Sequence, residues 1–133
     1  MTLLAPRTLT LRLDFPSRDL QPNGRLHYYA KAASVRAYRY DAKAEAKRVM
    51  GTTYRPGDFP LRTPVRAEVT FVVTDDRRHD TDNLIASIKA GWDGMVDARL
   101  LLDDHSGVLT WGEPRVVKGE RAGVVVVLME AEV

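Results

Sequence analysis

The stretch from Arg77 to Asp104, RRHDTDNLIASIKAGWDGMVDARLLLDD, constrains the fold of this chain more than any other. At about 100° per residue, its apolar side chains share one arc of a helix that begins near Asp82. These apolar residues are Leu84, Ile85, Ile88, Trp92, Met95 and Val96. Asp82, Lys89 and Asp93 fall together at the border of the arc, and an aspartate in the first turn suits the positive end of the helix dipole. The stretch therefore predicts one amphipathic helix with a buried face and a charged border.

Two segments ahead of this helix alternate apolar and polar residues, which is typical of half-buried strands. Residues 8–15 read TLTLRLDF, and residues 65–73 read VRAEVTFVV. Between them, residues 34–50 carry apolar side chains at helical spacing, with Ser34 as the expected N-cap and Gly51 as the expected end. Residues 51–64 hold the glycines and prolines of a loop.

The C-terminal part predicts two further strands. Residues 108–117 predict a strand that is interrupted near Gly112 and Pro114, and residues 118–123 predict a hairpin turn. Residues 124–129 are an unbroken apolar run, which predicts a strand covered on both faces. We therefore expect a single α/β (α+β) domain over residues 1–133, with a mixed sheet of about four strands and two main helices.

Composition narrows the class of protein. Of the 133 residues, 44% are hydrophobic and 29% are charged, as in a soluble globular domain. The absence of cysteine excludes a disulfide framework, a zinc–thiolate site and a cysteine nucleophile. No apolar run reaches membrane-spanning length and no signal-peptide pattern is present, so we expect a cytoplasmic protein without a membrane partner. The net charge of +2 is too small to indicate DNA binding without a view of where the charges lie.

The acids around the predicted helix indicate a metal. Asp80 and Asp82 are one residue apart, so in an extended segment both side chains point to the same side. Crowded carboxylates need a positive partner, and Mg²⁺ typically binds one or two carboxylates together with phosphate oxygens. The Asp103–Asp104 pair would complete the cluster if the fold returns it there, and Lys89 would place positive charge on a phosphate or a leaving oxygen. These acids predict Mg²⁺, with Mn²⁺ as a substitute, and metal-assisted chemistry at phosphorus.

Each motif also has a purely structural interpretation. A D-x-D-N string at a strand-to-helix junction is often a turn and an N-cap, and an isolated D-D pair is often a solvated turn. A calcium loop is disfavoured, because no Gly stands at the sixth position and no Glu at the twelfth.

The order of these motifs resembles the RusA family of Holliday-junction resolvases. D-x-D-N is followed by an apolar helix with K-x-x-x-D and then by D-D, and the basic pair Arg77–Arg78 stands directly before. The matching residues are Asp80, Asp82, Asn83, Lys89, Asp93, Asp103 and Asp104. The resemblance implies a homodimeric, Mg²⁺-dependent endodeoxyribonuclease, bacterial or phage-encoded, that resolves four-way DNA junctions by paired nicks in recombination and repair.

The same resemblance assigns roles to residues. Asp80, Asp82 and Asp104 are implied to be metal ligands, with Asp103 beside them, and Lys89 is implied to be an essential basic residue. The prototype of the family has its lysine one helical turn after the second aspartate, whereas Lys89 lies about two turns after Asp82. Both spacings return the lysine to nearly the same face of a helix.

Basic residues elsewhere predict a DNA-binding surface. Residues 25–31 interleave cations with aromatic rings, which suits phosphates and bases and resembles phage members of the same family, although Tyr28 and Tyr29 fit a core equally well. A basic stripe along the 34–50 helix is usually a solvated face, but here Asp41 and Glu45 fall elsewhere on the helix. The DNA contacts we expect are Arg25, His27, Lys31, Arg36, Arg39, Lys43, Arg77 and Arg78.

Two other functions stay open. The first is a nucleic-acid-binding module that does not cleave, although such a module needs no carboxylate cluster. The second is a metal-dependent nuclease that acts on flaps or RNA, which no feature of the sequence excludes.

Overall fold

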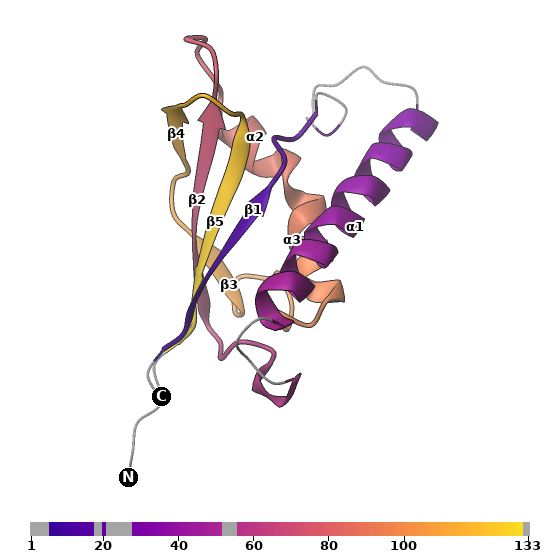
Figure 1. Cartoon of the computed structure of the whole chain (residues 1–133), viewed down its shortest axis with the longest axis vertical. Coiled ribbons are helices and arrows are strands. Elements are labelled where there is room, and N and C mark those ends of the chain that lie inside the picture. Colours follow the sequence, from indigo (N-terminus) through magenta and orange to yellow (C-terminus); the bar gives the residue numbers. More distant parts are fainter. Residues whose placement is uncertain (1–5, 18–19, 21–27, 52–55, 132–133) are drawn as a thin grey trace.

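The fold is seen in a computed structural model that describes residues 6–17, 20, 28–51 and 56–131. Its elements follow in the order β1 (Thr8–Leu13), α1 (Tyr28–Gly51), the 3-10 helix η2 (Pro56–Asp58), β2 (Val65–Val73), α2 (Thr81–Ser87), α3 (Lys89–Asp97), β3 (Leu109–Trp111), β4 (Arg115–Lys118) and β5 (Gly123–Met129) (Figure 1).

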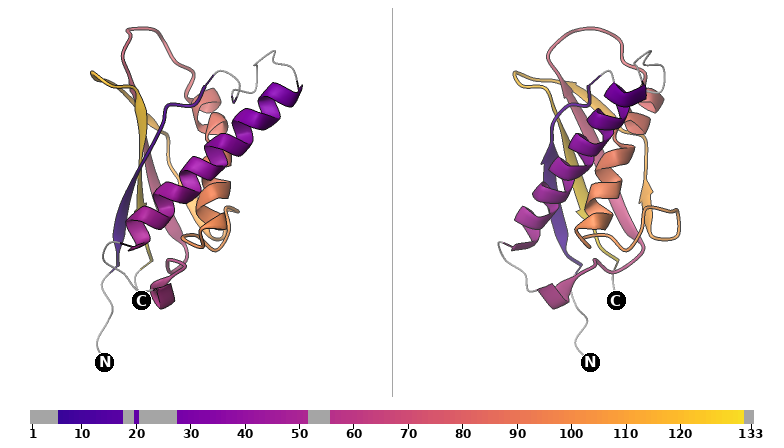
Figure 2. Two further views of the ribbon diagram at one scale, coloured as in Figure 1. Left: turned by 45° about the vertical axis from the view of Figure 1, so that its right-hand side comes forward. Right: turned by 90° about the vertical axis from the view of Figure 1, so that its right-hand side faces the viewer.

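The strands form one mixed sheet in the order β1-β5-β2-β3, and β4 also pairs with β2. The pairs β1–β5 and β5–β2 are antiparallel, whereas β3 and β4 run parallel to β2 along successive parts of its free edge. The helices α1, α2 and α3 all lie on one face of this sheet (Figure 2). The single α+β domain with a mixed sheet is confirmed, with five strands where the sequence predicts about four.

The alternating burial predicted for β1 and β2 is confirmed. In β1, Leu9, Leu11 and Leu13 are buried beneath the helices while the residues between them are exposed. In β2 the same pattern buries every second residue from Val65 to Val73. The predicted interruption near Gly112 and Pro114 is also confirmed, because it separates β3 from β4.

The prediction that β5 is covered on both faces is wrong. Val124, Val126 and Leu128 are buried, but Val125, Val127 and Met129 are only half-buried on the face that carries no helix. An unbroken apolar run shows only that apolar side chains are tolerated on both faces of the strand. On the helix-free face of β5, the neighbouring strands cover these side chains only in part.

The hairpin predicted at residues 118–123 is wrong as well. β4 and β5 do not pair with each other, because both pair with β2, which lies between them. The turn therefore carries the chain across the end of β2, where the Gly119 N–H donates to the Val73 carbonyl at 2.9 Å.

Helix α1 begins six residues before the predicted start. Ser34 is inside the helix and is no N-cap, and Lys31, predicted to lie in a loop, is helical. Alanines at 30, 32 and 33 favour this extension, because alanine has the highest helix propensity. The end at Gly51 and the buried stripe of Tyr38, Ala42 and Ala46 are confirmed. In the part of the chain that the structure describes, no helix is both long and apolar enough to cross a membrane.

Helices α1 and α3 pack closely at Gly94. A Cβ at this position would lie 2.9 Å from the Ala42 Cβ and 2.9 Å from the Lys43 backbone nitrogen, and it would collide with the Arg39 carbonyl oxygen. Gly94 therefore sets how near the two helices approach.

We expect Gly94→Ala to destabilise the protein by about 2 kcal/mol or more, because the added methyl group meets backbone that a side-chain rotation cannot move. Urea denaturation measures this change. Gly51→Ala is the matched control, since a Cβ there meets nothing within 4 Å. Equal stability of the Gly94 and Gly51 variants would contradict close packing at Gly94.

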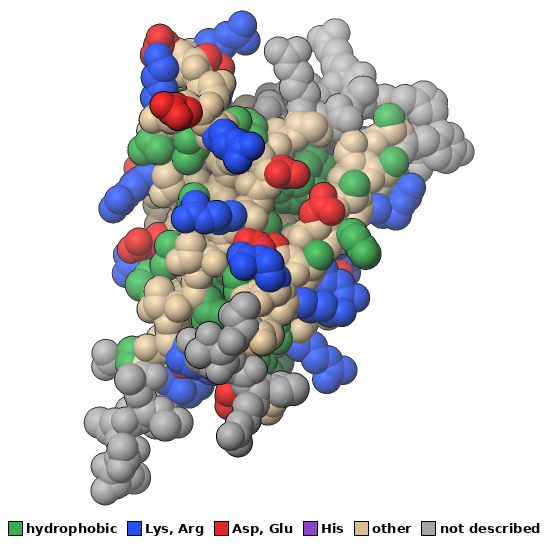
Figure 3. Space-filling model, in the orientation of Figure 1, with side chains coloured by type: hydrophobic (Ala, Val, Ile, Leu, Met, Phe, Trp, Pro, Cys, Tyr) green, Lys and Arg blue, Asp and Glu red, His purple; other side chains and the backbone are tan. Residues whose placement is uncertain are grey.

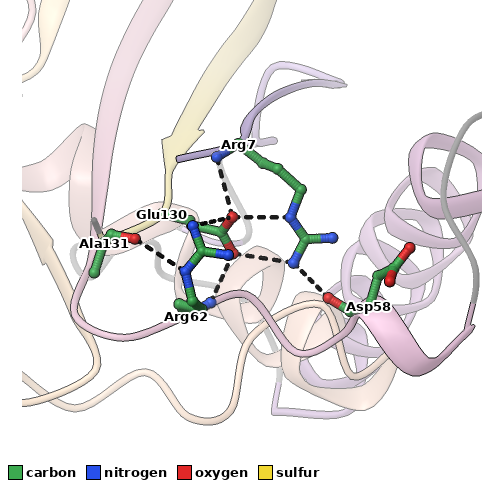
Figure 4. A network of polar contacts seen from close by, with 5 residues as sticks. All are labelled: Arg7, Asp58, Arg62, Glu130 and Ala131. Atoms are coloured by element: carbon green, nitrogen blue, oxygen red, sulfur yellow. Dashed lines mark hydrogen bonds and ion pairs between the residues drawn. The ribbon is translucent and has the colours of Figure 1, made fainter. Parts of the chain in front are cut away.

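A buried carboxylate ties the chain together at one end of the sheet (Figure 4). Glu130 is 4% exposed and accepts hydrogen bonds from the Arg7 side chain at 2.9 and 3.0 Å and from the Arg62 backbone N–H at 2.9 Å. Arg7 also donates to the Asp58 carbonyl, which attaches η2. Burial by itself would raise the pKa of Glu130, but the hydrogen bonds and positive charge of its arginine partners lower that pKa to about 2.

We expect Glu130→Gln to cost about 3 kcal/mol near neutral pH, because it leaves two arginines without their carboxylate. The folded pKa is below the ordinary value of 4.5, so this stabilisation is present above about pH 4.5 and is lost as the pH falls toward 2. As the pH is lowered, the denaturant midpoint should fall less steeply in Glu130→Gln than in the wild type. Glu68→Gln, at an exposed position, is the control. Identical acid profiles would contradict the pairing.

Candidate active site

The helix that carries the site is broken in two. α2 ends at Ser87 and α3 begins at Lys89, with Ile88 at φ −99° and ψ 13°, so the prediction of one continuous helix is wrong. The Ser87 hydroxyl donates to the Leu84 carbonyl at 2.5 Å, a local bond that competes with the helical ladder and bends helices. The predicted apolar arc is nevertheless confirmed, since Leu84, Ile88, Trp92 and Met95 are buried and Ile85 and Val96 pack against the core.

Asp80 is the N-cap of α2, and Asp82 lies in the first turn, as predicted. The Asp80 Oδ1 accepts from the backbone N–H of Asp82 at 2.9 Å and of Asn83 at 3.3 Å. The turn-and-cap interpretation of the D-x-D-N string is thus correct for one oxygen of Asp80. Its Oδ2 has only a long 3.5 Å contact with the Asn83 amide, and the exposed Asp82 carboxylate has no hydrogen bond or ion pair within the described ranges. Three of the four oxygens at the start of α2 are thus accessible to a ligand.

Lys89 brings together two acids that are distant along the chain. Its Nζ lies 2.9 Å from Asp93 Oδ1 and 2.7 Å from Asp104 Oδ2. The hydrogen bonds that Lys89 donates to Asp104 and Asp93 raise the pKa of Lys89, and the bond to Asp104 lowers the pKa of Asp104. Lys89 is therefore cationic and Asp104 anionic at neutral pH. Asp93 and Asp104 thus meet at Lys89, whereas the sequence predicted the D-D pair beside Asp80 and Asp82.

Asp103 has other partners than its neighbour Asp104. It is exposed, and its Oδ1 accepts from the Asp104 backbone N–H at 2.7 Å, while its Oδ2 is 3.9 Å from His105 Nε2. The side chain thus shapes the turn between α3 and β3 and does not contact Lys89.

The four acids predicted to share one cation form two separate groups. In residues 6–17, 20, 28–51 and 56–131, no three His, Asp or Glu side chains gather as metal ligands. The Lys89 ammonium neutralises Asp104 in place of a shared cation. The donor chemistry at the start of α2 still fits Mg²⁺, which needs only one or two carboxylates when phosphate and water complete its shell. The prediction of a metal ion stays a prediction.

Open space and a histidine adjoin Asp80. A cleft of about 510 Å³ is lined by Arg78, His79, Asp80 and Thr81. His79 Nε2 lies 2.9 Å from Asp75 Oδ1, and the hydrogen bond from His79 lowers the pKa of Asp75. The sequence analysis did not select His79, although its position four residues after Asp75 and directly before Asp80 was a visible signal.

The predicted DNA contacts lie on two surfaces. Arg25 and His27 lie outside the described residues. Lys31, Arg36 and Lys43 are partly or fully exposed on α1, where Lys and Arg side chains follow the helix along the edge of the molecule (Figure 3). Arg77 and Arg78 are exposed on the loop between β2 and α2, directly before Asp80.

Arg39 differs from the rest of the basic stripe. Its guanidinium pairs with both carboxylate oxygens of Asp97 in α3, at 2.5 and 2.7 Å. The hydrogen bond and charge of Asp97, with a contribution from Asp93, raise the pKa of Arg39. The stripe is therefore partly neutralised by another helix, which spacing within α1 does not reveal.

Comparison with known proteins adds a distant relative. No family model matches the chain. An uncharacterized protein of Xylella fastidiosa is 32% identical over 100 residues, which cover 72% of this chain. The chain spans about 60% of the length of that relative.

The cap geometry predicts a contrast between two neighbouring acids. Asp80→Ala should cost about 1 kcal/mol, because two backbone N–H groups lose their acceptor, whereas Asp80→Asn keeps an acceptor oxygen and should cost less. Asp82→Ala is the matched control and should stay within about 0.5 kcal/mol of the wild type, since no such bond is lost. Thermal unfolding measures all three variants. A larger loss for Asp82→Ala than for Asp80→Ala would reverse the assignment of the cap.

Proposed function

We propose that this protein is a Mg²⁺-dependent endodeoxyribonuclease of the RusA type that nicks branched DNA, with four-way junctions as the substrate. The observation that carries the proposal is the Lys89 ammonium held between Asp93 and Asp104, on a helix pair that begins with the Asp80–Asp82 carboxylates. A lysine and several acids on one exposed border suit phosphate chemistry, whereas a module that only binds DNA gains nothing from clustered negative charge.

Asp80 and Asp82 are the residues that would hold the cation, through Asp80 Oδ2 and the unpaired Asp82 carboxylate. A bound Mg²⁺ supplies a Lewis acid for hydrolysis of the phosphodiester. Asp104 holds the Lys89 ammonium in place through its ion pair, and its carboxylate would be open to a cation if a substrate phosphate took its place at Lys89. Lys89 then carries its charge to the phosphate or to the leaving oxygen.

The basic residues are arranged to hold the DNA backbone. Arg77 and Arg78 lie shortly before Asp80 in the sequence, and α1, which carries the other exposed cations, covers the same face of the sheet as α3. A homodimer is part of the proposal, because a four-way junction has two equivalent cleavage points that a two-fold dimer matches. The dimer rests on the family resemblance.

Purified protein incubated with labelled four-way junctions tests the activity directly. We expect paired nicks with Mg²⁺ or Mn²⁺ and none with EDTA. Flaps, RNA and linear duplex in the same panel separate a junction resolvase from another metal-dependent nuclease. Junction binding without nicking under either metal would refute the enzyme and leave the binding module.

Two substitutions connect the activity to the site. Asp82→Asn should abolish nicking, because it removes ligand charge from an exposed position without disturbing the cap. Lys89→Ala should lower the nicking rate about a hundredfold, as the loss of one charge-stabilising donor does in other enzymes. Single-turnover rates and junction affinity measure both effects, and affinity should change little. Asp41→Asn, at an exposed position on α1, is the control. Full activity of Lys89→Ala would show that the role belongs to another residue.

A further inference from the structure

A pair of stacked tryptophans borders the candidate site. The rings of Trp92 in α3 and Trp111 in β3 are nearly parallel, with their centroids 5.3 Å apart and their planes at 10°. Trp92 is 2% exposed and belongs to the core, whereas Trp111 is 40% exposed. Since one face of the Trp111 ring covers Trp92, its exposure belongs to the opposite face and the ring edges. The result is a flat aromatic surface that is held rigidly and open to solvent.

The position of Trp111 links it to Lys89. Trp92 stands three residues after Lys89 and one before Asp93, so the tryptophan pair lies at the same stretch of α3 as the ion pairs. Asp104, which binds Lys89, lies in the turn that leads into β3. Trp111 pairs with Ala67 at the edge of the sheet, and its side chain lies on the helical face together with Leu109. The open ring thus lies beside α3 at the edge of the sheet.

The charges around the ring restrict what it contacts. Asp93, Asp103 and Asp104 lie on α3 and the turn before β3, and Glu113 follows two residues after Trp111. Lys89 neutralises only part of this negative charge. A phosphate against the ring would be repelled, whereas a nucleobase is neutral and stacks on indole.

We propose that Trp111 is a stacking platform for an unpaired nucleobase of DNA bound at the Lys89 site. The proposal rests on the proposed function, because that function brings DNA to the Lys89 site. The proposal names the part of the substrate that is recognised, a base outside the duplex stack. A branch point or a single strand offers such a base, and a continuous duplex does not. The contribution of Trp111 is non-ionic, so it should persist as salt weakens the phosphate contacts.

Tryptophan fluorescence in EDTA tests the platform apart from cleavage. The chain has only two tryptophans, so a change in emission is readily assigned. A single-stranded oligothymidylate should quench the wild type, and a blunt duplex should not. Trp111→Phe should bind the oligonucleotide nearly as well but lose the quenching, because phenylalanine stacks without the indole emission. Trp111→Leu should weaken binding at least about fivefold, with the same ratio to wild type at low and moderate salt.

The outcomes separate this inference from the proposed nuclease. Quenching by the single strand without any nicking of junctions in Mg²⁺ would support the platform and refute the nuclease. Nicking without quenching, or wild-type affinity in Trp111→Leu, would refute the platform alone. Emission that shifts with protein concentration in the absence of DNA would place Trp111 in a contact between copies and overturn the proposal. Should Trp111→Leu unfold, the loss of quenching in Trp111→Phe decides the question.

Discussion

The ion pair between Lys89 and Asp104 is the interaction on which the arrangement of the site depends. It joins the start of α3 to the turn that precedes β3, fifteen residues later, and so fixes where that turn lies against the helix. Asp93, one helical turn after Lys89, completes the contact from the same helix. Two carboxylates and one amine leave one excess negative charge, so the group still attracts a cation after its internal pairing.

The break at Ile88 stands between the acids at the start of α2 and the ion pairs of Lys89. Asp82 and Lys89 are seven residues apart, which corresponds to about 10 Å along a helix axis, and Lys89 is directed toward Asp93 and Asp104. The Ser87 hydroxyl bond lies between the two charged positions. The first group, at the cap of α2, has free carboxylate oxygens, whereas the second carries its own positive charge. This division suits a centre in which one end holds a metal ion and the other holds an amine ready for a phosphate.

The spacing of apolar residues within a segment predicted the features of the fold that depend on that segment alone. The alternation in β1 and β2 identified their buried residues because side chains in a strand alternate strictly between the faces, and the apolar arc of α2 and α3 held even across the break. The open face of β5 and the placement of β2 between β4 and β5 depend on which strands pair, and spacing within one segment does not contain that information. The extended start of α1 shows alanine propensity outweighing a plausible serine cap.

In the site, too, spacing predicted contacts within one helix and missed contacts between distant elements. Helical spacing placed Lys89 and Asp93 on one border, whereas Asp104 was predicted with Asp80 and Asp82 around a cation and instead pairs with Lys89. The sequence did not identify Asp97 as the partner of Arg39, the two arginines around Glu130, or the stacking of Trp111 on Trp92. Each of these contacts joins elements that are far apart in sequence, so composition and periodicity carry no signal for them.

Crystals soaked in Mn²⁺ test the central claim most directly, because the anomalous signal locates the ion without reference to activity. The account predicts a peak coordinated by Asp80 and Asp82, present in the wild type and absent in Asp82→Asn. No peak at the start of α2 under Mn²⁺ concentrations that support nicking, or a peak confined to another surface, would contradict a catalytic metal at this centre.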